Sequence, residues 1–341
     1  MKNQFISIPK VYLYALFICL LASCKDAKNT DPIDLSGKIV IPATTQDTVL
    51  FVTSVDNFSL PVFISFPSSS SNSLPATVVL HGSGGNWKDS DQNNDGTADT
   101  VTEWELSSQN KEWKNIFDQE GIVSAFPGSY YGRGTVENEG DWKNPPLQFG
   151  ISATFIRNYD AYSTLELLRK LVREDGTPIV TSDKVALLGF SHGATAVQST
   201  LFNTNAIPNG HEWSQSYSGT TYTTEIKAPA SLPTDGGFIA GVMYYPGSFH
   251  NSYYGNPCSG TSFFQTYTDF IIHLPSDDSL TPNSNCMVET VGNNGGGTST
   301  VYNYENVDHG FDRKVSGADG AASTLALQRS IDFLKTKLEI N

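Results

Sequence analysis

Short apolar runs alternate with amphipathic segments along most of the chain from residue 76 onward. The runs have the length of buried strands, and the segments between them carry apolar residues at helical spacing, as Leu165, Leu168 and Val172 do. Strands that alternate with helices form a mostly parallel sheet with helices on both faces, so we predict an α/β fold. The predicted strands are residues 76–80, 122–126, 185–188, 238–244, 270–274 and 301–304.

Both ends of this region have patterns of their own. Residues 37–67 alternate apolar and polar side chains, which predicts antiparallel strands at the N-terminal edge of the sheet. Near the C-terminus, Leu327, Ile331 and Leu334 lie on one face of a closing helix. The chain shows no internal repeat, and we expect residues 37–341 to form a single α/β domain.

The first 36 residues have the pattern of an export signal followed by a tether. Two lysines precede an apolar run at 11–21, and Leu-Ala-Ser then leads to Cys24. The run is shorter than the about twenty residues that span a bilayer, and small residues before a cysteine resemble a bacterial lipoprotein signal. We predict a lipoprotein signal peptide at 1–23, lipidation of Cys24 and a tether at 24–36. An ordinary signal peptide is the alternative.

The predicted lipid would hold the mature protein to a membrane as a bacterial outer-membrane lipoprotein, facing the periplasm or the cell surface. The chain has 35 acidic and 21 basic side chains and a net charge of −14. Such a chain repels phosphate backbones, so nucleic acid is not an expected partner. In an oxidising compartment Cys258 and Cys286 are expected to form a disulfide around the strand at 270–274, because two isolated cysteines do not make a zinc site.

Residues Gly189 to Gly193 read Gly-Phe-Ser-His-Gly and lie between a predicted strand and a predicted helix. A serine on such a sharp turn needs positive φ, and glycines beside it avoid collisions with the strand and the helix. The helix that follows directs its N-terminal amides at the site, where they stabilise a developing oxyanion. We therefore predict Ser191 as the nucleophile of a hydrolase. A loop after a buried strand is the alternative.

In folds with this turn, an acid and then a histidine follow the serine along the chain. The strand at 270–274 leads into a turn that contains Asp277 and Asp278, and His309 is the only histidine after them. His309 is therefore the predicted base, which would take the Ser191 proton while the acid orients its imidazole. Asp278 is our choice for the acid, and Asp277 stays open.

A glycine-rich loop, His81 to Gly85, follows the predicted strand at 76–80. Its backbone can approach a substrate closely, so we predict an oxyanion hole made by the amides of Ser83 and His192. A phosphate cradle is the alternative, but the glycine motifs of nucleotide-binding loops are missing from this chain.

On these motifs the chain resembles the α/β-hydrolase superfamily, and within it the dienelactone hydrolase family. The resemblance covers residues 76–338. It implies hydrolysis of an ester or lactone by a triad of Ser191, Asp278 and His309, with no cofactor for catalysis. Some members of the family have a cysteine nucleophile, so the serine here makes dienelactone itself an unexpected substrate. The matching segments are residues 81–85, 133–134, 157–160, 189–193, 244–246, 278–282 and 309–312.

An acidic insertion at 89–105 matches the start of a calcium-binding loop, with oxygen-bearing side chains at alternate positions. The twelfth position is Thr102 rather than the usual glutamate. Glu103, Glu105 or Asp89 would then supply the bidentate carboxylate. We predict a structural Ca²⁺ beside the active site, with a solvated acidic loop as the alternative. The predicted ligands are Asp91, Asn93, Asp95, Thr97 and Asp99.

Residues 203–236 are rich in polar and aromatic side chains and form a candidate cap. Its aromatic rings would either stack on a sugar or phenolic acyl group, or only pack a long loop onto the domain. We interpret His211, His250 and His273 as structural.

The motifs predict an exported serine hydrolase that cleaves carboxylic esters through an acyl-enzyme. Esters of plant polysaccharides, polyesters and small lactones all fit this prediction. One alternative is a serine peptidase or amidase of the same fold, which must protonate an amine leaving group. The other is a noncatalytic, calcium-dependent binding protein on a hydrolase scaffold, which the complete serine, acid and histidine set disfavours.

Overall fold

The computed structural model divides the chain into two units, Met1–Asp31 and Pro32–Asn341. The predicted signal peptide, Cys24 and the five predicted calcium ligands lie outside the residues that the structure describes. No helix in the described part of the chain is long and apolar enough to cross a membrane. The structure describes residues 31–68, 73–88, 104–131, 133, 152–217, 220–223, 228–247, 253–255, 257–294 and 296–340.

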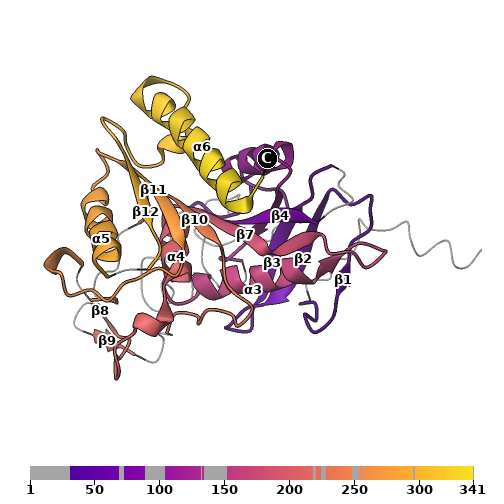
Figure 1. The fold of residues 1–341 in the computed structure, drawn as a ribbon, viewed down its shortest axis with the longest axis horizontal. Helices are drawn as coiled ribbons and strands as arrows, with labels where there is room; N and C mark the ends of the chain where they lie inside the picture. The colour runs from indigo at the N-terminus through magenta and orange to yellow at the C-terminus, as the bar shows by residue number, and fades with distance from the viewer. Residues whose placement is uncertain are drawn as a thin grey trace, which may run out of the picture. The chain divides into compact units, whose positions relative to one another are not determined.

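An eight-stranded sheet forms the centre of the larger unit, with the strand order β12-β11-β10-β7-β4-β5-β3-β2 (Figure 1). The strands from β12 to β5 are parallel to one another, and β3 and β2 add to the sheet in antiparallel pairing. The predicted α/β class and the antiparallel N-terminal edge are both confirmed. The strands are β2 (Asp47–Thr53), β3 (Ser59–Ser65), β4 (Leu74–Leu80), β5 (Val123–Pro127), β7 (Val180–Phe190), β10 (Ala240–Tyr244), β11 (Asp269–Pro275) and β12 (Ser299–Tyr304).

Helices cover both faces of the sheet, and in Figure 1 α6 lies on the opposite side from α3 and α4. Successive side chains of a strand point to opposite faces, so Val78 belongs to one apolar core and Val79 to the other. Leu187 and Leu188 on β7 divide in the same way. The helices are α1 (Ser108–Gln119), α3 (Arg157–Lys170), α4 (His192–Leu201), α5 (Thr281–Asn294) and α6 (Gly317–Leu338).

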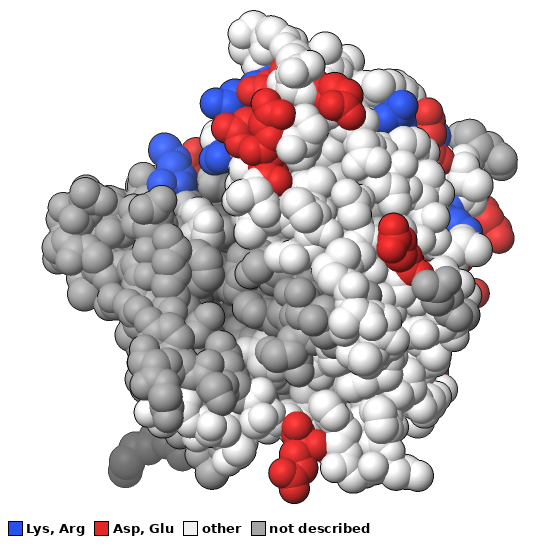
Figure 2. All heavy atoms as spheres, turned by 90° about the vertical axis from the view of Figure 1, so that its left-hand side faces the viewer, with Lys and Arg blue, Asp and Glu red and all other residues white. Residues whose placement is uncertain are grey.

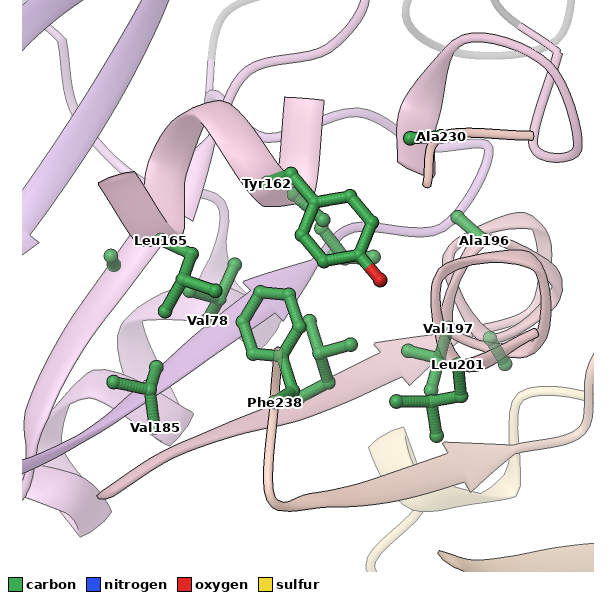
Figure 3. Packing of buried hydrophobic residues seen from close by; sticks show 14 of the residues in the cluster. Val78, Tyr162, Leu165, Val185, Ala196, Val197, Leu201, Ala230 and Phe238 are labelled. Carbon is green, nitrogen blue, oxygen red and sulfur yellow. The ribbon is translucent and has the colours of Figure 1, made fainter. Parts of the chain in front are cut away.

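Figure 3 shows the core beneath α3 and α4, where the ring of Tyr162 lies against Phe238 at a centroid distance of 5.7 Å. The Tyr162 hydroxyl donates to the Thr200 carbonyl, so the buried polar end of this side chain is satisfied. Burial of each large apolar side chain stabilises the fold by roughly 1.5–3 kcal/mol. This core fixes α4, and with it the start of the helix at His192.

One helix ends earlier than its pattern predicts. Val172 has helical spacing with Leu168, but α3 ends at Lys170, and Leu171–Val172 form the short strand β6. β6 pairs with β1 (Ile39–Val40), so Leu171 is extended rather than helical. A tertiary strand pairing has overridden the local helical pattern.

The candidate cap contains a short antiparallel pair, β8 (Gln215–Tyr217) with β9 (Thr220–Tyr222), and the 3-10 helix η3 (Thr204–Ala206). The ring of Trp213 lies 4.7 Å from that of His211 and 5.9 Å from that of Phe155, centroid to centroid. These contacts favour the interpretation that aromatic residues of the segment pack it onto the domain.

Charge is distributed unevenly over the face of the molecule drawn in Figure 2. Acidic side chains gather near one rim together with lysines and arginines, and most of the other described surface on this face is uncharged. The net charge of −14 is therefore not gathered into one large patch on this face.

Candidate active site

Ser191 occupies the turn between β7 and α4, with φ 49° and ψ −116°. Positive φ is rare for a residue with a side chain, and such strain is found where the surrounding structure enforces it. The two glycines of the motif explain how the turn is accommodated. A Cβ on Gly189 would lie 2.5 Å from the Gly193 carbonyl oxygen, and a Cβ on Gly193 would lie 2.0 Å from that of Leu80. The G-x-S-x-G pattern is therefore a packing requirement of this turn.

His309 and Asp278 lie beside Ser191 in one chain of hydrogen bonds. His309 Nε2 is 2.9 Å from Ser191 Oγ, and His309 Nδ1 is 2.6 Å from Asp278 Oδ2. The three residues come from three different loops, each at the carboxyl end of a parallel strand. The structure thus brings together the serine, acid and histidine predicted from the sequence.

Asp278, and not Asp277, is the carboxylate next to the histidine. Asp278 is buried, and its other oxygen, Oδ1, accepts a hydrogen bond from the Leu280 amide at 2.9 Å. That bond fixes the carboxylate and leaves Oδ2 directed at His309. Asp277 is exposed, and its side chain accepts from the Ser276 hydroxyl. The alternative of Asp277 is therefore not supported by the geometry.

Tyr245 packs against the imidazole, with its ring centroid 4.6 Å from that of His309. The Tyr245 hydroxyl donates to Asp312 Oδ1, and Gln109 Nε2 donates to Asp312 Oδ2 at 2.6 Å. Burial raises the pKa of Asp312 above its usual range and the pKa of Tyr245 well above its own. Tyr245 also has a positive φ of 37°, unusual for a bulky residue.

Sequence reasoning assigned no role to Tyr245, Asp312 or Gln109, although the segments 244–246 and 309–312 are among those that carry the family resemblance. A signal was present, because Tyr245 directly follows β10 and polar residues at the carboxyl ends of parallel strands gather at binding sites. Asp312 lies three residues after His309, in the same loop.

The predicted oxyanion loop lies against the turn that holds Ser191. A Cβ on Gly82 would be 3.4 Å from the Phe190 carbonyl oxygen and 3.7 Å from Ser191 Cβ. Ser83 follows at once, and His192 is the first residue of α4. Ser83 and His192, the two residues predicted to donate amides, are thus each next in sequence to the residues that meet here, Gly82 and Ser191.

Buried polar residues lie behind this loop. Arg157 is fully buried and donates through Nη2 to the His81 carbonyl at 2.7 Å, while its Nη1 is 3.0 Å from His192 Nδ1. The Tyr130 hydroxyl lies 2.7 Å from the same His192 nitrogen.

A second arginine of this region is fully paired. Arg133 makes two hydrogen bonds to Asp160 and two to Asp56, and the Asp160 side chain is completely buried. Such a bidentate arrangement suits a buried guanidinium.

Among the described residues, no group of three or more histidine, cysteine, aspartate or glutamate side chains is arranged to hold a metal ion. Glu105, one alternative source of the calcium carboxylate, lies 2.8 Å from Lys88 and 3.6 Å from Lys111. Of the three carboxylates that could complete the predicted calcium site, Glu105 is the one that the structure describes, and it interacts with two lysines.

The two cysteines predicted to pair lie at bonding distance, with the sulfur atoms of Cys258 and Cys286 2.17 Å apart. Cys286 is in α5, directly after the turn that holds Asp278. Of the histidines interpreted as structural, His273 is buried in β11 between Tyr304 and Ser330, and His250 lies outside the described residues.

No protein-family model matches the chain, and no curated protein matches it. Several solved structures do. An esterase from the planctomycete Thermogutta terrifontis is similar over 89% of this chain and 94% of its own, with 16% identity and a TM-score of 0.51. The same esterase phosphorylated by paraoxon has 16% identity over 85% of this chain and 94% of its own, with a TM-score of 0.52.

A dienelactone hydrolase-like promiscuous phosphotriesterase from metagenomic libraries is similar over 86% of this chain and 99% of its own. Its identity is 13% and its TM-score 0.50. At identities this low, the structural similarity establishes the fold and nothing finer. The chain has the α/β-hydrolase fold that its motifs predicted. A shared fold does not by itself fix the reaction, which has to be argued from the site.

Proposed function

We propose that this protein is a serine hydrolase of carboxylic esters, similar to the dienelactone hydrolase family, and that Ser191, His309 and Asp278 are its catalytic triad. The observation that carries the proposal is the hydrogen-bond chain from Asp278 Oδ2 through both ring nitrogens of His309 to Ser191 Oγ. A serine on a strained turn, with a histidine nitrogen in place to accept its hydroxyl proton, is equipped for nucleophilic attack.

In the first half of the reaction, Ser191 Oγ attacks the ester carbonyl carbon and passes its proton to His309 Nε2. Asp278 accepts the Nδ1 proton in a hydrogen bond and stabilises the imidazolium that forms. The carbonyl oxygen becomes an oxyanion, for which the amides of Ser83 and His192 are the proposed donors. His309 then protonates the leaving alkoxide, which departs as an alcohol and leaves an acyl group on Ser191.

In the second half, a water molecule attacks the acyl-enzyme and gives its proton to His309. Collapse of the second oxyanion returns the proton to Ser191 Oγ and releases the carboxylic acid. The triad and the proposed oxyanion donors supply every group that this mechanism uses, so the proposed chemistry requires no cofactor.

The structural neighbours support this reaction class. One is an esterase in its native form, and the same protein has been seen phosphorylated by paraoxon. Short acyl esters are a reasonable first substrate class, with polysaccharide-linked acyl esters, polyesters and lactones as the wider range. A serine peptidase or amidase remains the second candidate, since its triad would be the same. A noncatalytic binding protein is less well supported, because binding alone needs no aligned triad.

We further propose export as a lipoprotein anchored at Cys24, on the outer membrane, and a structural Ca²⁺ in the segment 89–105. Both rest on sequence patterns. The calcium would order the segment that follows the Ser83 loop and take no part in the chemistry.

The proposal is tested by measuring hydrolysis of p-nitrophenyl acetate, butyrate and octanoate by the mature protein, by Ser191→Ala, and by Ser182→Ala as a control at an exposed serine. We expect activity in the wild type and in Ser182→Ala, and its loss in Ser191→Ala. Chelation of calcium should lower thermal stability more than activity. If wild-type protein is inert on all three esters but cleaves peptide p-nitroanilides, the peptidase candidate replaces the esterase.

A further inference from the structure

Arg157 is a buried cation with no ion-pair partner among the described residues. Its side chain is fully excluded from solvent at the start of α3. The nearest acid in sequence, Asp160, is bound at both oxygens by Arg133. Burial lowers the pKa of Arg157, yet a guanidinium stays protonated in proteins. The charge of Asp160 acts in the opposite direction, but Arg133 already binds that carboxylate, so Arg157 is only partly compensated. An incompletely compensated buried charge is costly, and such costs persist where the charge serves the site.

The donors of Arg157 are directed at the two segments that flank the nucleophile. Nη2 donates to the carbonyl of His81, which begins the glycine-rich loop, and Nη1 donates to the ring of His192, which follows Ser191. The Tyr130 ring lies 5.4 Å from the guanidinium carbon and presents its π face to the cation. One side chain thus joins the loop that holds Ser83 to the residue that starts α4.

The contact also fixes the state of His192. Because a guanidinium can only donate, His192 Nδ1 must be the acceptor, and the neutral ring carries its proton on Nε2.

We propose that Arg157 is a positioning residue of the oxyanion hole: it ties the His81 loop to His192 and supplies a buried positive charge, only partly balanced by the Asp160 that Arg133 binds, which the tetrahedral intermediate compensates. This inference rests on the proposed ester hydrolysis. Burial of this charge costs most free energy in the free enzyme, and the oxyanion balances it when the tetrahedral intermediate forms. An interaction gained only at that stage lowers the barrier and does not strengthen substrate binding.

The experiment compares wild type with Arg157→Met and Arg157→Lys. Arg169→Met serves as a matched control, because Arg169 lies on the same helix but pairs with Asp235, whose side chain is largely exposed. For each variant we would measure kcat and KM on p-nitrophenyl butyrate, normalised by active-site titration, and the inhibition constant of an alkyl trifluoromethyl ketone. That ketone adds to the serine as a tetrahedral oxyanion and reports on the same charge.

We expect Arg157→Met to lower kcat about 100-fold, with little change in KM, because a displaced His81 loop would cost the site the Ser83 amide, and loss of one oxyanion-hole donor has an effect of that size. Inhibition by the trifluoromethyl ketone should weaken by the same factor by which kcat/KM falls. Arg157→Lys should recover part of the loss, because it keeps the charge but not the two-pronged contact. Arg169→Met should match wild type.

The inference is overturned if folded Arg157→Met keeps the wild-type kcat/KM, or if its loss lies in KM alone. If Arg157→Met does not fold, His192→Ala decides the matter, since it removes the ring that Arg157 contacts and keeps the backbone amide. Unchanged kcat/KM and ketone inhibition in His192→Ala would then overturn it. These failures differ from failure of the proposed function, in which the wild type itself hydrolyses no ester.

Discussion

The Leu80 carbonyl oxygen occupies the space that a side chain on Gly193 would need, since a Cβ there would lie 2.0 Å from it. The strand β4 and the helix α4 therefore approach one another through a glycine, and this approach sets the position of the Ser191 turn. The relationship explains why the motif ends in glycine.

Gly193→Ala should therefore destroy the site. Backbone atoms cannot move aside as a flexible side chain can, so we expect misfolded protein, or folded protein with the turn displaced and activity lost. Circular dichroism and p-nitrophenyl butyrate hydrolysis would measure this. Gly292→Ala is the control, because that helix position has open space and the change should stabilise the protein by roughly 0.5–1 kcal/mol. A fully active Gly193→Ala would refute this account of the turn.

The two aspartates of the acid turn should differ sharply. Asp278→Asn removes the charge beside His309 and can leave the ring in the wrong tautomer, which lowers kcat by about 10⁴-fold in a serine protease triad. Asp277→Asn should stay near wild-type activity, because that side chain is exposed and bonds only to Ser276 among the described residues. Equal losses in the two variants would contradict the assignment of the acid.

Tyr245→Phe should weaken the site through Asp312. The change removes the hydroxyl that Asp312 accepts and leaves a partly buried carboxylate with one donor fewer, at a cost of about 1–3 kcal/mol in unfolding free energy. The ring against His309 is kept, so kcat should fall less than in Tyr245→Leu. Urea unfolding of Tyr245→Phe, Asp312→Asn and the double variant would test this in a double-mutant cycle. Strictly additive effects would show that the pair is not coupled.

Buried histidine should make the protein sensitive to mild acid. Burial lowers the pKa of His273 to about 3, and burial also lowers the pKa of His81 well below its usual range. Both groups titrate near 6.5 in the unfolded chain. Between about pH 6.5 and about pH 3 the unfolded state binds more protons, so the unfolding free energy falls with falling pH, by up to about 1.4 kcal/mol per pH unit for each group.

Urea unfolding from about pH 7 to about pH 4 would measure this slope. His273→Gln can keep hydrogen bonds to Tyr304 and Ser330 but does not titrate, so its stability should depend less steeply on pH. A wild-type stability that is flat over this range would contradict the burial of neutral histidines.

The turn that holds Ser191 was predictable because the residues that it requires are adjacent in sequence. Two glycines around a serine, after an apolar run, describe a backbone that few other structures need. The mostly parallel sheet and its antiparallel edge followed from short apolar runs and from residue patterns of period two, whereas the order of the strands was not predicted. The prediction of a helical Val172 was wrong, because pairing with β1, more than a hundred residues away in sequence, outweighed the helical spacing of its apolar neighbours.

Contacts between distant residues account for what sequence reasoning left open. Asp277 and Asp278 share a turn, and only the packed direction of each side chain separates them. The bond from Tyr245 to Asp312 joins residues 67 positions apart, and Arg157 reaches His192 across 35 positions. Single-sequence patterns encode spacing along a chain, so they do not report which polar groups meet in the fold.

Trapping of the acyl-enzyme tests the central claim most directly. The protein would be mixed with excess p-nitrophenyl butyrate, quenched in acid within the first turnover, digested, and its peptides analysed by mass spectrometry. We predict a butyryl group on Ser191 in the wild type and none in Ser191→Ala. Rapid ester hydrolysis with no acylated Ser191, or with the acyl group on another residue, would contradict the mechanism.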